Sequence, residues 1–542
     1  MQKILQTERA KCAKITVKND QRKLKSSDVG KHLNVRDYVT GLIRNPEETE
    51  ELIEYAESYA HSIGLVSRTN ERSFSSEPAI LVPIALLPSA FPRELYEQAV
   101  DVHATLAELY FRVACDHAFL VESFRDVCKT DAFTARMVGI VQAVHAEQNQ
   151  GVRQPLTLSL QRADYLVHWE PQKDSFELKQ IEFNIGPIGG PGCATQAAKL
   201  HAKMLDRLHA IHGSDMPMLA EAFKPDVKAR QKFARTLYQA WKLFGDPNAI
   251  LLYITNSTND PMCHFEGLQF VQFEVEKHGK RDGHLVEVVQ MTLSKAAERL
   301  TLDENGDFSL FVDGTKRVAL AHITEGNMPE EFPTEREWHA RTMLERSNAI
   351  LSPNIRTELS SSKKIQQASI LAMPGILERF FTDEPDKCVA LRRTFAGLWG
   401  LENDDEFTRG IINEAIRSPQ NYVLKCQLEA GKGNFFDDEL VKKLGQLTLA
   451  ERGAFILQQK IKPMSVKNFL MRPFKPVELD DVIGELGIFG SLIGDQSTRK
   501  LLWNTVDGHV LKTRSASVNQ AGVTAGFGVV DTPLLFDASE FF

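Results

Sequence analysis

The stretch KQIEFNIGPIGGPGCATQAAKL, residues 179–200, constrains the fold more than any other part of the chain. An apolar run ends in Glu182 and Asn184, a glycine-dense turn follows, and a helical pattern begins near residue 194. Glycines gathered between a strand and a helix mark a place where the backbone turns tightly or approaches another group closely. The stretch therefore predicts a strand–turn–helix unit of the kind found in layered α/β or α+β proteins.

A dinucleotide-binding loop is one interpretation of this unit, because strand, glycine turn and helix are its required context. The spacing argues against it: Gly190 and Gly192 supply G-x-G, but Thr195 occupies the third glycine position. On the strand, Glu182 and Asn184 are two residues apart, which places both oxygen-bearing side chains on one face. A carboxylate beside an amide oxygen suits a hard cation such as Mg2+, and an ordinary exposed strand end is the alternative.

The stretch NYVLKCQLEAGKGNFFDDEL contains a second candidate site. It is not a P-loop, because Cys426 replaces the first glycine of that motif and Gly433 stands where Ser or Thr would hold the metal. Instead, Lys425 ends an apolar strand, Glu429 follows four residues later, and a turn over 431–434 lies beyond. A cation, a metal-binding carboxylate and a mobile backbone turn are the parts needed to hold a triphosphate.

Two further segments, GAFILQQKIKP and IGELGIFG, each begin with or contain an apolar strand. The edge of the first strand can pair with adenine through its backbone, and Glu485 of the second can bind a ribose. Hairpin turns and a charged strand end explain the same segments without a ligand.

Length, charge and cysteine content limit the class of protein. A chain of 542 residues exceeds the size at which one hydrophobic core keeps growing, so roughly two or three domains are expected. A net charge of −8 argues against a nucleic-acid-binding surface, and the longest apolar stretch, at 78–92, is too short and proline-rich to span a bilayer. Seven widely spaced cysteines disfavour a zinc site and suit a reducing compartment.

The chain changes in character along its length. Residues 1–38 form a basic extension that we expect to be mobile. Residues 45–150 have helical spacing, and alternating strands and helices follow from about residue 154, with hairpin-like β segments near the end. The N-terminus has no apolar segment typical of a signal peptide, so a cytoplasmic location is the default, and a secreted one applies if such a peptide was removed.

Taken together, these segments resemble the eukaryotic type of glutathione synthetase, an ATP-grasp ligase. The resemblance covers nearly the whole chain from about residue 40. It rests on the sequence segments DAFTARM, QRADYLV, LKQIEFN, FGDPNA, LFVDG, GNMPEEF, SSKKIQQ, RRTFAGLWGL, FILQQKI, ELGIFG and AGVTAG.

The resemblance implies an α/β fold of the ATP-grasp type, with a glycine-rich lid and commonly a homodimer. It divides the chain into the extension, an N-terminal helical and ATP-grasp part (39–245), an inserted Rossmann-like substrate-binding domain (246–361), and the ATP-grasp core with its lid (362–542). In the family, ATP phosphorylates the C-terminal carboxylate of γ-glutamylcysteine, and the amine of glycine then attacks the acyl phosphate. Metal ions, cations and a dry site serve this chemistry.

The resemblance also implies roles for individual residues, with ATP as a substrate and Mg2+, as a pair of ions, as the cofactor. The metal ligands would be Glu182, Asn184 and Glu429. ATP would contact Lys363, Lys425, Gly431, Lys432, Gly433, Asn434, Phe436, Gln458, Gln459, Lys460, Ile461, Glu485, Arg514 and Gln520. Arg162 and Lys512 would be catalytic, and the peptide substrate would meet Arg162, Pro187, Gly189, Thr324, Asn327, Lys512, Val523 and Thr524.

The peptide-substrate positions depart from the family more than the nucleotide positions do. A serine-rich run is replaced by residues 186–189, and an Arg-x-x-Tyr pair that meets the substrate carboxylate becomes Thr324 and Asn327. A further polar region of the substrate domain, at about 259–265, keeps none of its partners. Losing an arginine that pairs with a buried carboxylate costs about 2–5 kcal/mol, or roughly thirty- to several-thousand-fold in affinity.

Other departures preserve charge. Lys512 replaces an arginine, which keeps the cation but loses the bidentate fork, and Arg514 replaces a lysine. In the lid, three glycines become Ala430, Gly431 and Lys432, where Ala430 restricts positive φ and the Lys432 charge faces either phosphate or solvent.

Three functions are consistent with this pattern. The first is a ligase that still uses Mg-ATP on an altered acyl substrate or amine. The second is a glutathione synthetase of normal specificity whose pocket is refilled by compensating residues. The third is a non-catalytic binding protein on the same fold, because the pattern of loss resembles diverged glutathione-synthetase-like effectors that plant-parasitic nematodes secrete.

Overall fold

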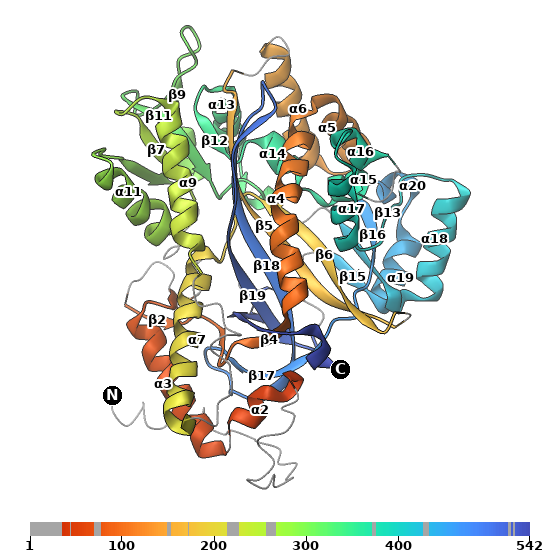
Figure 1. Ribbon diagram of the computed structural model, residues 1–542. Helices are drawn as coiled ribbons and strands as arrows, with labels where there is room; N and C mark the ends of the chain where they lie inside the picture. The colour runs from red at the N-terminus through yellow and green to blue at the C-terminus, as the bar shows by residue number, and fades with distance from the viewer. Residues whose placement is uncertain are drawn as a thin grey trace.

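The structure is a computed structural model. It describes residues 35–43, 45–69, 77–148, 153–171, 173–213, 227–255, 267–370, 375–426, 433–518, 522–523 and 526–542. Within these ranges the chain forms a large mixed sheet covered by helices, and a smaller sheet beside it (Figure 1). The predicted α/β layering is confirmed.

A 13-stranded sheet forms the centre of the molecule. Its order is β17-β3-β20-β19-β18-β5-β12-β11-β10-β9, with β6 paired to β5, and β7 paired to β11 and β8. Its strands are β3 (Ile84–Ala85), β5 (Leu156–Glu170), β6 (Ser175–Ile185), β7 (Ile250–Ile254), β8 (Val288–Met291), β9 (Leu300–Leu302), β10 (Leu310–Val312), β11 (Lys316–Ile323), β12 (Ile350–Ser352), β17 (Val466–Met471), β18 (Leu479–Asp495), β19 (Lys500–Ser515) and β20 (Gly528–Asp531).

Four long antiparallel strands, in the order β6, β5, β18 and β19, form the middle of this sheet. Helix α4 (Arg93–Cys115) packs along one face of β18. Two glycines of β18 permit this close approach: a Cβ added to Gly490 would lie 2.1 Å from His103 Nε2, and one added to Gly494 would lie 2.2 Å from Phe111 Cε2. The opposite face of the four strands carries the charged side chains described below.

The region predicted to be mostly helical contains α2 (Tyr38–Leu42), α3 (Pro46–Ser62), α4, α5 (His117–Ser123) and α6 (Ala132–Glu147). It also contains four short strands: β1 (Val66–Arg68), β2 (Ala79–Leu81), β3 and β4 (Ser89–Pro92). Strands β2, β3 and β4 lie within the apolar 78–92 stretch, whose Leu86 and Leu87 are fully buried. Strand β4 pairs with β21 (Pro533–Phe536) near the C-terminus.

The described residues begin at Val35, within the predicted basic extension. Val35 and Tyr38 are buried, and Val35–Asp37 form a short 3-10 turn. The remainder of the extension, residues 1–34, lies outside the described residues.

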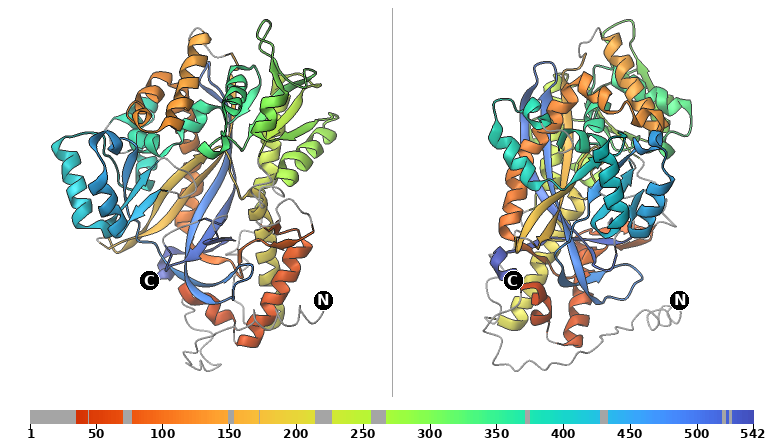
Figure 2. Two further views of the ribbon diagram at one scale, coloured as in Figure 1. Left: turned by 180° about the vertical axis from the view of Figure 1, so that it is seen from behind. Right: turned by 90° about the vertical axis from the view of Figure 1, so that its right-hand side faces the viewer.

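The lobe over 246–361 extends one edge of the sheet. Strands β8, β7, β11 and β12 run parallel, and Leu351 of β12 pairs with Thr157 of β5. The helices of this lobe and its neighbourhood are α9 (Ala229–Phe244), a π-helical segment (Gly267–Glu274), α11 (Val275–Arg281), α12 (Leu293–Arg299), α13 (Glu335–Arg346) and α14 (Ile355–Ser360). Figure 2 shows this lobe and the smaller sheet on opposite sides of the central strands.

The smaller sheet has four strands in the order β13-β16-β14-β15 and a hydrophobic cluster of its own. Its strands are β13 (Leu398–Gly400), β14 (Tyr422–Cys426), β15 (Asn434–Phe436) and β16 (Phe455–Gln459), and it contacts α18 (Glu406–Arg417), α19 (Asp437–Gln446) and α20 (Leu449–Arg452). Helix α15 (Lys363–Ile370) contacts both β6 and β16 and so joins the two sheets. Helices α16 (Ile376–Phe380) and α17 (Pro385–Thr394) follow it.

Two sequence-based expectations concern cysteines and membranes. The five cysteines within the described residues, Cys115, Cys128, Cys193, Cys388 and Cys426, are free thiols. Among the helices described here, none combines the length and the apolar character needed to cross a bilayer.

The contact between α4 and β18 gives a stability prediction. Gly494→Ala should lower the free energy of unfolding by about 1–3 kcal/mol, because the added methyl group would overlap the Phe111 ring. The matched control is Gly410→Ala in exposed helix α18, where nothing lies within 4 Å of the new Cβ. It should stabilise by up to about 1 kcal/mol through better helix propensity. Urea unfolding midpoints measure both, and equal midpoints for the two variants would contradict this packing.

Candidate active site

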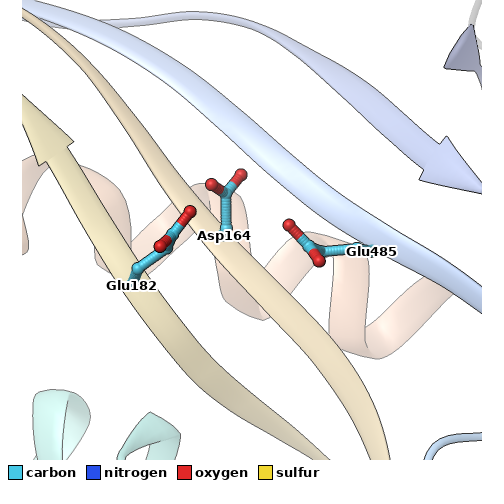
Figure 3. A group of neighbouring side chains, drawn as sticks. All are labelled: Asp164, Glu182 and Glu485. Carbon is cyan, nitrogen blue, oxygen red and sulfur yellow. The ribbon is translucent and has the colours of Figure 1, made fainter. Parts of the chain in front are cut away.

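Charged side chains gather on the face of the four central strands that α4 does not cover. Asp164 on β5, Glu182 on β6 and Glu485 on β18 point toward one another (Figure 3), and one carboxylate oxygen from each lies within 4.8 Å of the others. The strand register causes this convergence, since Asp164 pairs with Glu182 and Glu485 pairs with Lys512 of β19. A diagonal row of charges therefore crosses four adjacent strands.

Arg162 is held by Asp164 in a forked ion pair. Its Nε lies 2.7 Å and 2.9 Å from the two carboxylate oxygens, and its Nη2 lies 2.8 Å from Oδ2. Gly487 faces this pair, and a Cβ there would lie 2.9 Å from both Arg162 Cδ and Asp164 Oδ1. The glycine of the ELG segment is therefore needed to leave room for the pair.

Lys512 joins the same network from the other side. Its Nζ lies 3.1 Å from Asp164 Oδ2 and forms a close ion pair with Glu485. Burial raises the pKa of Asp164 to about 6, while Arg162 and Lys512 keep it from rising further. At neutral pH, Asp164 is a buried carboxylate shared by two cations.

Glu182 is the carboxylate with the strongest cationic surroundings. Burial alone would raise its pKa, but Lys512, Lys363, Arg162 and Lys425 together lower it far below its usual range. Lys363 begins α15 and Lys425 lies on β14, so their influence shows that the second sheet and the joining helix both reach this site. Glu182 is ionised at any physiological pH and is available to a cation.

The residues present fit a divalent metal ion. Glu182 and Asn184 share a face of β6, as predicted, because they are two residues apart, and they pair in regular register with Asp164 and Arg162 of β5. The Asn184 amide nitrogen donates to Asp164 at 3.0 Å and to Glu182 at 3.1 Å, an orientation that a 180° rotation of the amide would exchange for its oxygen. Glu429, the third predicted ligand, lies outside the described residues.

Sequence reasoning missed Asp164. The available signal was its position two residues after Arg162 on a predicted strand, which places both side chains on the same face. In the segment QRADYLV a role is predicted for Arg162 alone, whereas in the structure Asp164 contacts both Arg162 and Lys512.

The nucleotide positions on the smaller sheet lie on neighbouring strands. Lys425 pairs with Asn434 of β15 and with Ile456 of β16. The side-chain oxygen of Asn434 is buried and has no hydrogen-bond partner among the described residues. An unpaired buried acceptor beside a lysine suits a bound polar ligand.

The adenine-side segment is partly committed to internal contacts. Gln459 accepts a hydrogen bond from Gly397 N at 3.1 Å, and Lys460 Nζ lies 3.2 Å from an Asp437 oxygen. Gln458 is buried, while Phe436 and Ile461 are half-buried.

Three other residues predicted to bind ATP or the peptide substrate lie within the described structure: Arg514, Val523 and Gly433. Glu485 acts on Arg514, although burial is the larger effect and lowers the arginine's pKa. Val523 packs against the main core, and Gly433 adopts a φ of 71° beside β15. Gly431, Lys432, Gln520 and Thr524 lie outside the described residues.

The glycine turn borders the charged network. Arg162 Nη1 donates to the carbonyl oxygen of Gly189 at 3.1 Å, and Pro187 beside it is exposed. Gly190 has a φ of 108°, and helix α7 (Pro191–His212) begins directly after it. The turn therefore fixes the edge of the site.

Thr324 and Asn327 lie beyond the end of β11 and are not joined to the Arg162 network by any hydrogen bond or ion pair of the described residues. Thr324 Oγ1 donates to the Ile254 carbonyl at 3.2 Å, which turns its hydroxyl toward β7. The backbone N–H of Asn327 donates to Glu331 at 2.9 Å. Neither residue supplies the cation that the resemblance places at these positions.

Comparison with known proteins gives a consistent result. The model of the eukaryotic glutathione synthase ATP-binding domain matches residues 46–535. The chain is 33% identical over 493 residues to the glutathione synthetase of Homo sapiens, covering 91% of this chain and 98% of that protein. It is 33% identical over 453 residues to the chloroplastic glutathione synthetase of Arabidopsis thaliana, covering 83% and 78%. A solved glutathione synthetase like-effector from Globodera pallida, in apoform, is similar with a TM-score of 0.71 at 29% identity, covering 92% and 99%.

Asp164 gives the site a direct stability test. Asp164→Asn should cost about 3–5 kcal/mol of unfolding free energy, because Arg162 and Lys512 would lose a fully buried counter-charge. The control is Asp481→Asn, which breaks an exposed 2.9 Å pair with Lys467 and should cost less than about 1 kcal/mol. Urea titration followed by circular dichroism distinguishes them. Equal small effects would mean that the pair is not buried in solution.

Proposed function

Because the chain belongs to the eukaryotic glutathione synthetase family, we propose that it is an ATP-dependent carbon–nitrogen ligase with altered specificity for its acyl substrate or its amine. It would join the carboxylate of a γ-glutamyl thiol peptide to an amine through an acyl phosphate. The observation that carries this proposal is the charged network around Glu182, where cations from three separate parts of the fold meet.

The charge balance of the network supports a polyphosphate ligand. Three carboxylates, Asp164, Glu182 and Glu485, are accompanied by five cations, Arg162, Lys363, Lys425, Lys512 and Arg514, which leaves an excess of two positive charges. Near 4 Å and at an effective dielectric constant of about 20, each cation contributes roughly 4 kcal/mol of gross attraction to a phosphate charge. Mg-ATP is the ligand that this excess favours.

Glu182 and Asn184 are the described residues that would hold Mg2+, which would supply positive charge to offset that of the phosphates. Lys363 and Lys425 would contact the phosphates, and the unpaired oxygen of Asn434 would accept a hydrogen bond from a donor group of the nucleotide. The proposal includes a pair of Mg2+ ions, as the resemblance implies, and a homodimer. It also includes a cytoplasmic location, or a secreted one if a signal peptide was removed.

In the proposed reaction, a substrate carboxylate oxygen attacks the γ-phosphorus of ATP, the bond to ADP breaks, and an acyl phosphate forms. An amine then attacks the acyl carbon, phosphate leaves, and the amine loses a proton. Arg162 and Lys512, which both pair with Asp164, would orient the carboxylate and offset the negative charge of the transferring phosphoryl group. Asp164 fixes both cations, so little reorganisation is needed during the reaction.

Altered specificity is supported by the region after β11. Thr324 and Asn327 offer no cation to a substrate carboxylate, and the neighbouring Glu325 is buried with its pKa raised to about 7 by burial. Glu325 accepts a hydrogen bond from Leu293 N at 2.7 Å, so it caps α12 instead of replacing the missing arginine. A substrate with an uncharged group at this end fits better than γ-glutamylcysteine.

A non-catalytic binding protein is the second candidate. The solved glutathione synthetase like-effector from Globodera pallida favours it, because that protein shares this fold over nearly its whole length. The two candidates differ in one respect: only the ligase consumes ATP.

The first test is Mg-ATP-dependent phosphate release with γ-glutamylcysteine and a panel of amines that includes glycine, with products identified by mass. We expect a ligated product, with glutathione absent or in trace amounts. Glu182→Gln should reduce phosphate release at least about a hundredfold, since it removes a metal-binding charge. Glu177→Gln on the same strand, which pairs with Lys173 and Lys179, is the control and should be nearly as active as the unmodified chain.

If no substrate pair gives ATP-dependent phosphate release, the ligase proposal is refuted and the non-catalytic binding protein remains. Brisk glutathione formation from γ-glutamylcysteine and glycine would refute altered specificity.

Restoring a cation near Thr324 should produce a gain of function. The double substitution Thr324→Arg with Asn327→Tyr should lower the KM for γ-glutamylcysteine by about thirtyfold or more, because it restores a cation for the substrate carboxylate. Glu330→Gln, which raises the net charge by the same one unit at a nearby exposed position, should leave KM unchanged. If both variants lower KM equally, the effect is long-range attraction and Thr324 does not determine specificity.

A further inference from the structure

A cavity of about 50 Å3 lies at the far end of the central sheet from the ATP-binding network. It is lined by residues of α6, the start of β5, the end of α13, β12 and α14, elements that gather at the top of the molecule in Figure 1. Leu156 of its wall pairs with Asp495 of β18, whereas Asp164 pairs with Gly487. Eight residues of β5 separate the two sites, which at about 3.3 Å per residue is roughly 26 Å.

One wall of this cavity carries Arg356. Its Nε donates to the Ala114 carbonyl at 3.0 Å, and its Nη2 lies 3.5 Å from the Cys115 carbonyl. No ion pair within 4 Å is formed by Arg356 among the described residues. Burial lowers the pKa of Arg356, so its charge is stabilised poorly by the surroundings. An anionic group in the cavity would satisfy it.

Another wall carries Glu345, whose side chain is 9% exposed. Its Oε1 accepts from Ile355 N at 2.9 Å and lies 3.2 Å from Arg341 Nη2, but Arg341 is shared with Glu358 at 3.0 Å. Burial raises the pKa of Glu345 despite these contacts. A cationic group in the cavity would satisfy this carboxylate.

Glu345 and Arg356 form no ion pair with each other within the described structure, although both line the same cavity. Buried charges of opposite sign normally approach and pair, because each is costly alone. Here both line the cavity, and each favours the charged form of the other without forming an ion pair. Gln496, whose side chain is buried, adds a carbonyl oxygen that has no hydrogen-bond partner among the described residues.

The rest of the lining is mixed. Val141, Val144, Leu156 and Leu351 supply an apolar part, and His145, Gln148, Gln154, Ser347 and Asn354 add polar groups. On the same measure of volume a single water needs about 10–15 Å3, so the cavity holds about four such groups, or a molecule of some five or six heavy atoms. A ligand of this size could place an anionic end at Arg356, a cationic end at Glu345 and a small apolar part against the apolar side chains.

We propose that this cavity is a binding site for a small zwitterionic α-amino acid with a short aliphatic side chain. Its carboxylate pairs with Arg356, its ammonium group pairs with Glu345 and donates to Gln496 Oε1, and its side chain lies against Val144 and Leu156. The site is separate from the proposed ligase site and does not depend on the proposed function.

The test uses the full chain without ATP and measures binding of labelled L-alanine by equilibrium dialysis. We expect one saturable site per chain. Glu345→Gln and Arg356→Gln should each weaken binding at least about thirtyfold, because each leaves one charge of the ligand unpaired. Glu330→Gln and Lys280→Gln, which neutralise exposed charges elsewhere, should have no effect.

Alanine binding by two further variants tests whether the ligand occupies the cavity. Arg162→Gln, which damages the ATP network, should leave alanine binding intact. Val144→Phe, which fills the cavity without changing a charge, should abolish binding even if a charge variant fails to fold, as judged by circular dichroism.

The contrary results are equally definite. Propionate, which has the carboxylate alone, should bind far more weakly than alanine, and equal binding would overturn the zwitterion proposal in favour of a simple anion site. The absence of saturable alanine binding would also overturn it, as would binding that survives Val144→Phe.

Discussion

Asp164 lies fully buried between Arg162 and Lys512, and most of the central architecture follows from satisfying that one carboxylate. An unpaired carboxylate in this position would cost several kcal/mol, so cations must reach it from adjacent strands. β5 supplies one cation and β19 the other, across β18, where Gly487 leaves room for them. The strand order and register of the middle of the sheet are therefore tied to the charge balance of the site.

The same requirement links the two sheets. Glu182 stays ionised because Lys363 and Lys425 add their charges to those of the large sheet, and these lysines come from the joining helix and from the smaller sheet. The network that results carries an excess of positive charge. The proposed polyphosphate ligand would offset this charge.

The sequence predicted the parts of this site that depend on local pattern. Glu182 and Asn184 were found by their alternation on one strand, and Lys425 by its place at a strand end, and the structure brings them to one region. Asp164 was missed although it follows the same alternation, because its importance comes from cross-strand neighbours that are distant in sequence. Thr324 was predicted to face substrate, but its hydroxyl bonds to Ile254, a contact that only the pairing of β7 with β11 creates. The bulge beside Tyr165 and the cavity between Glu345 and Arg356 likewise depend on tertiary packing.

The central claim is that the network around Glu182 is a working site for a metal–nucleotide complex. Crystals grown with Mn2+ and a non-hydrolysable ATP analogue, with anomalous diffraction measured at the manganese edge, test it most directly. The account predicts an anomalous peak within about 2.2 Å of oxygen atoms of Glu182 and Asn184, with the triphosphate against Lys363 and Lys425. An unoccupied network in crystals saturated with both ligands, or a metal bound elsewhere, would contradict it.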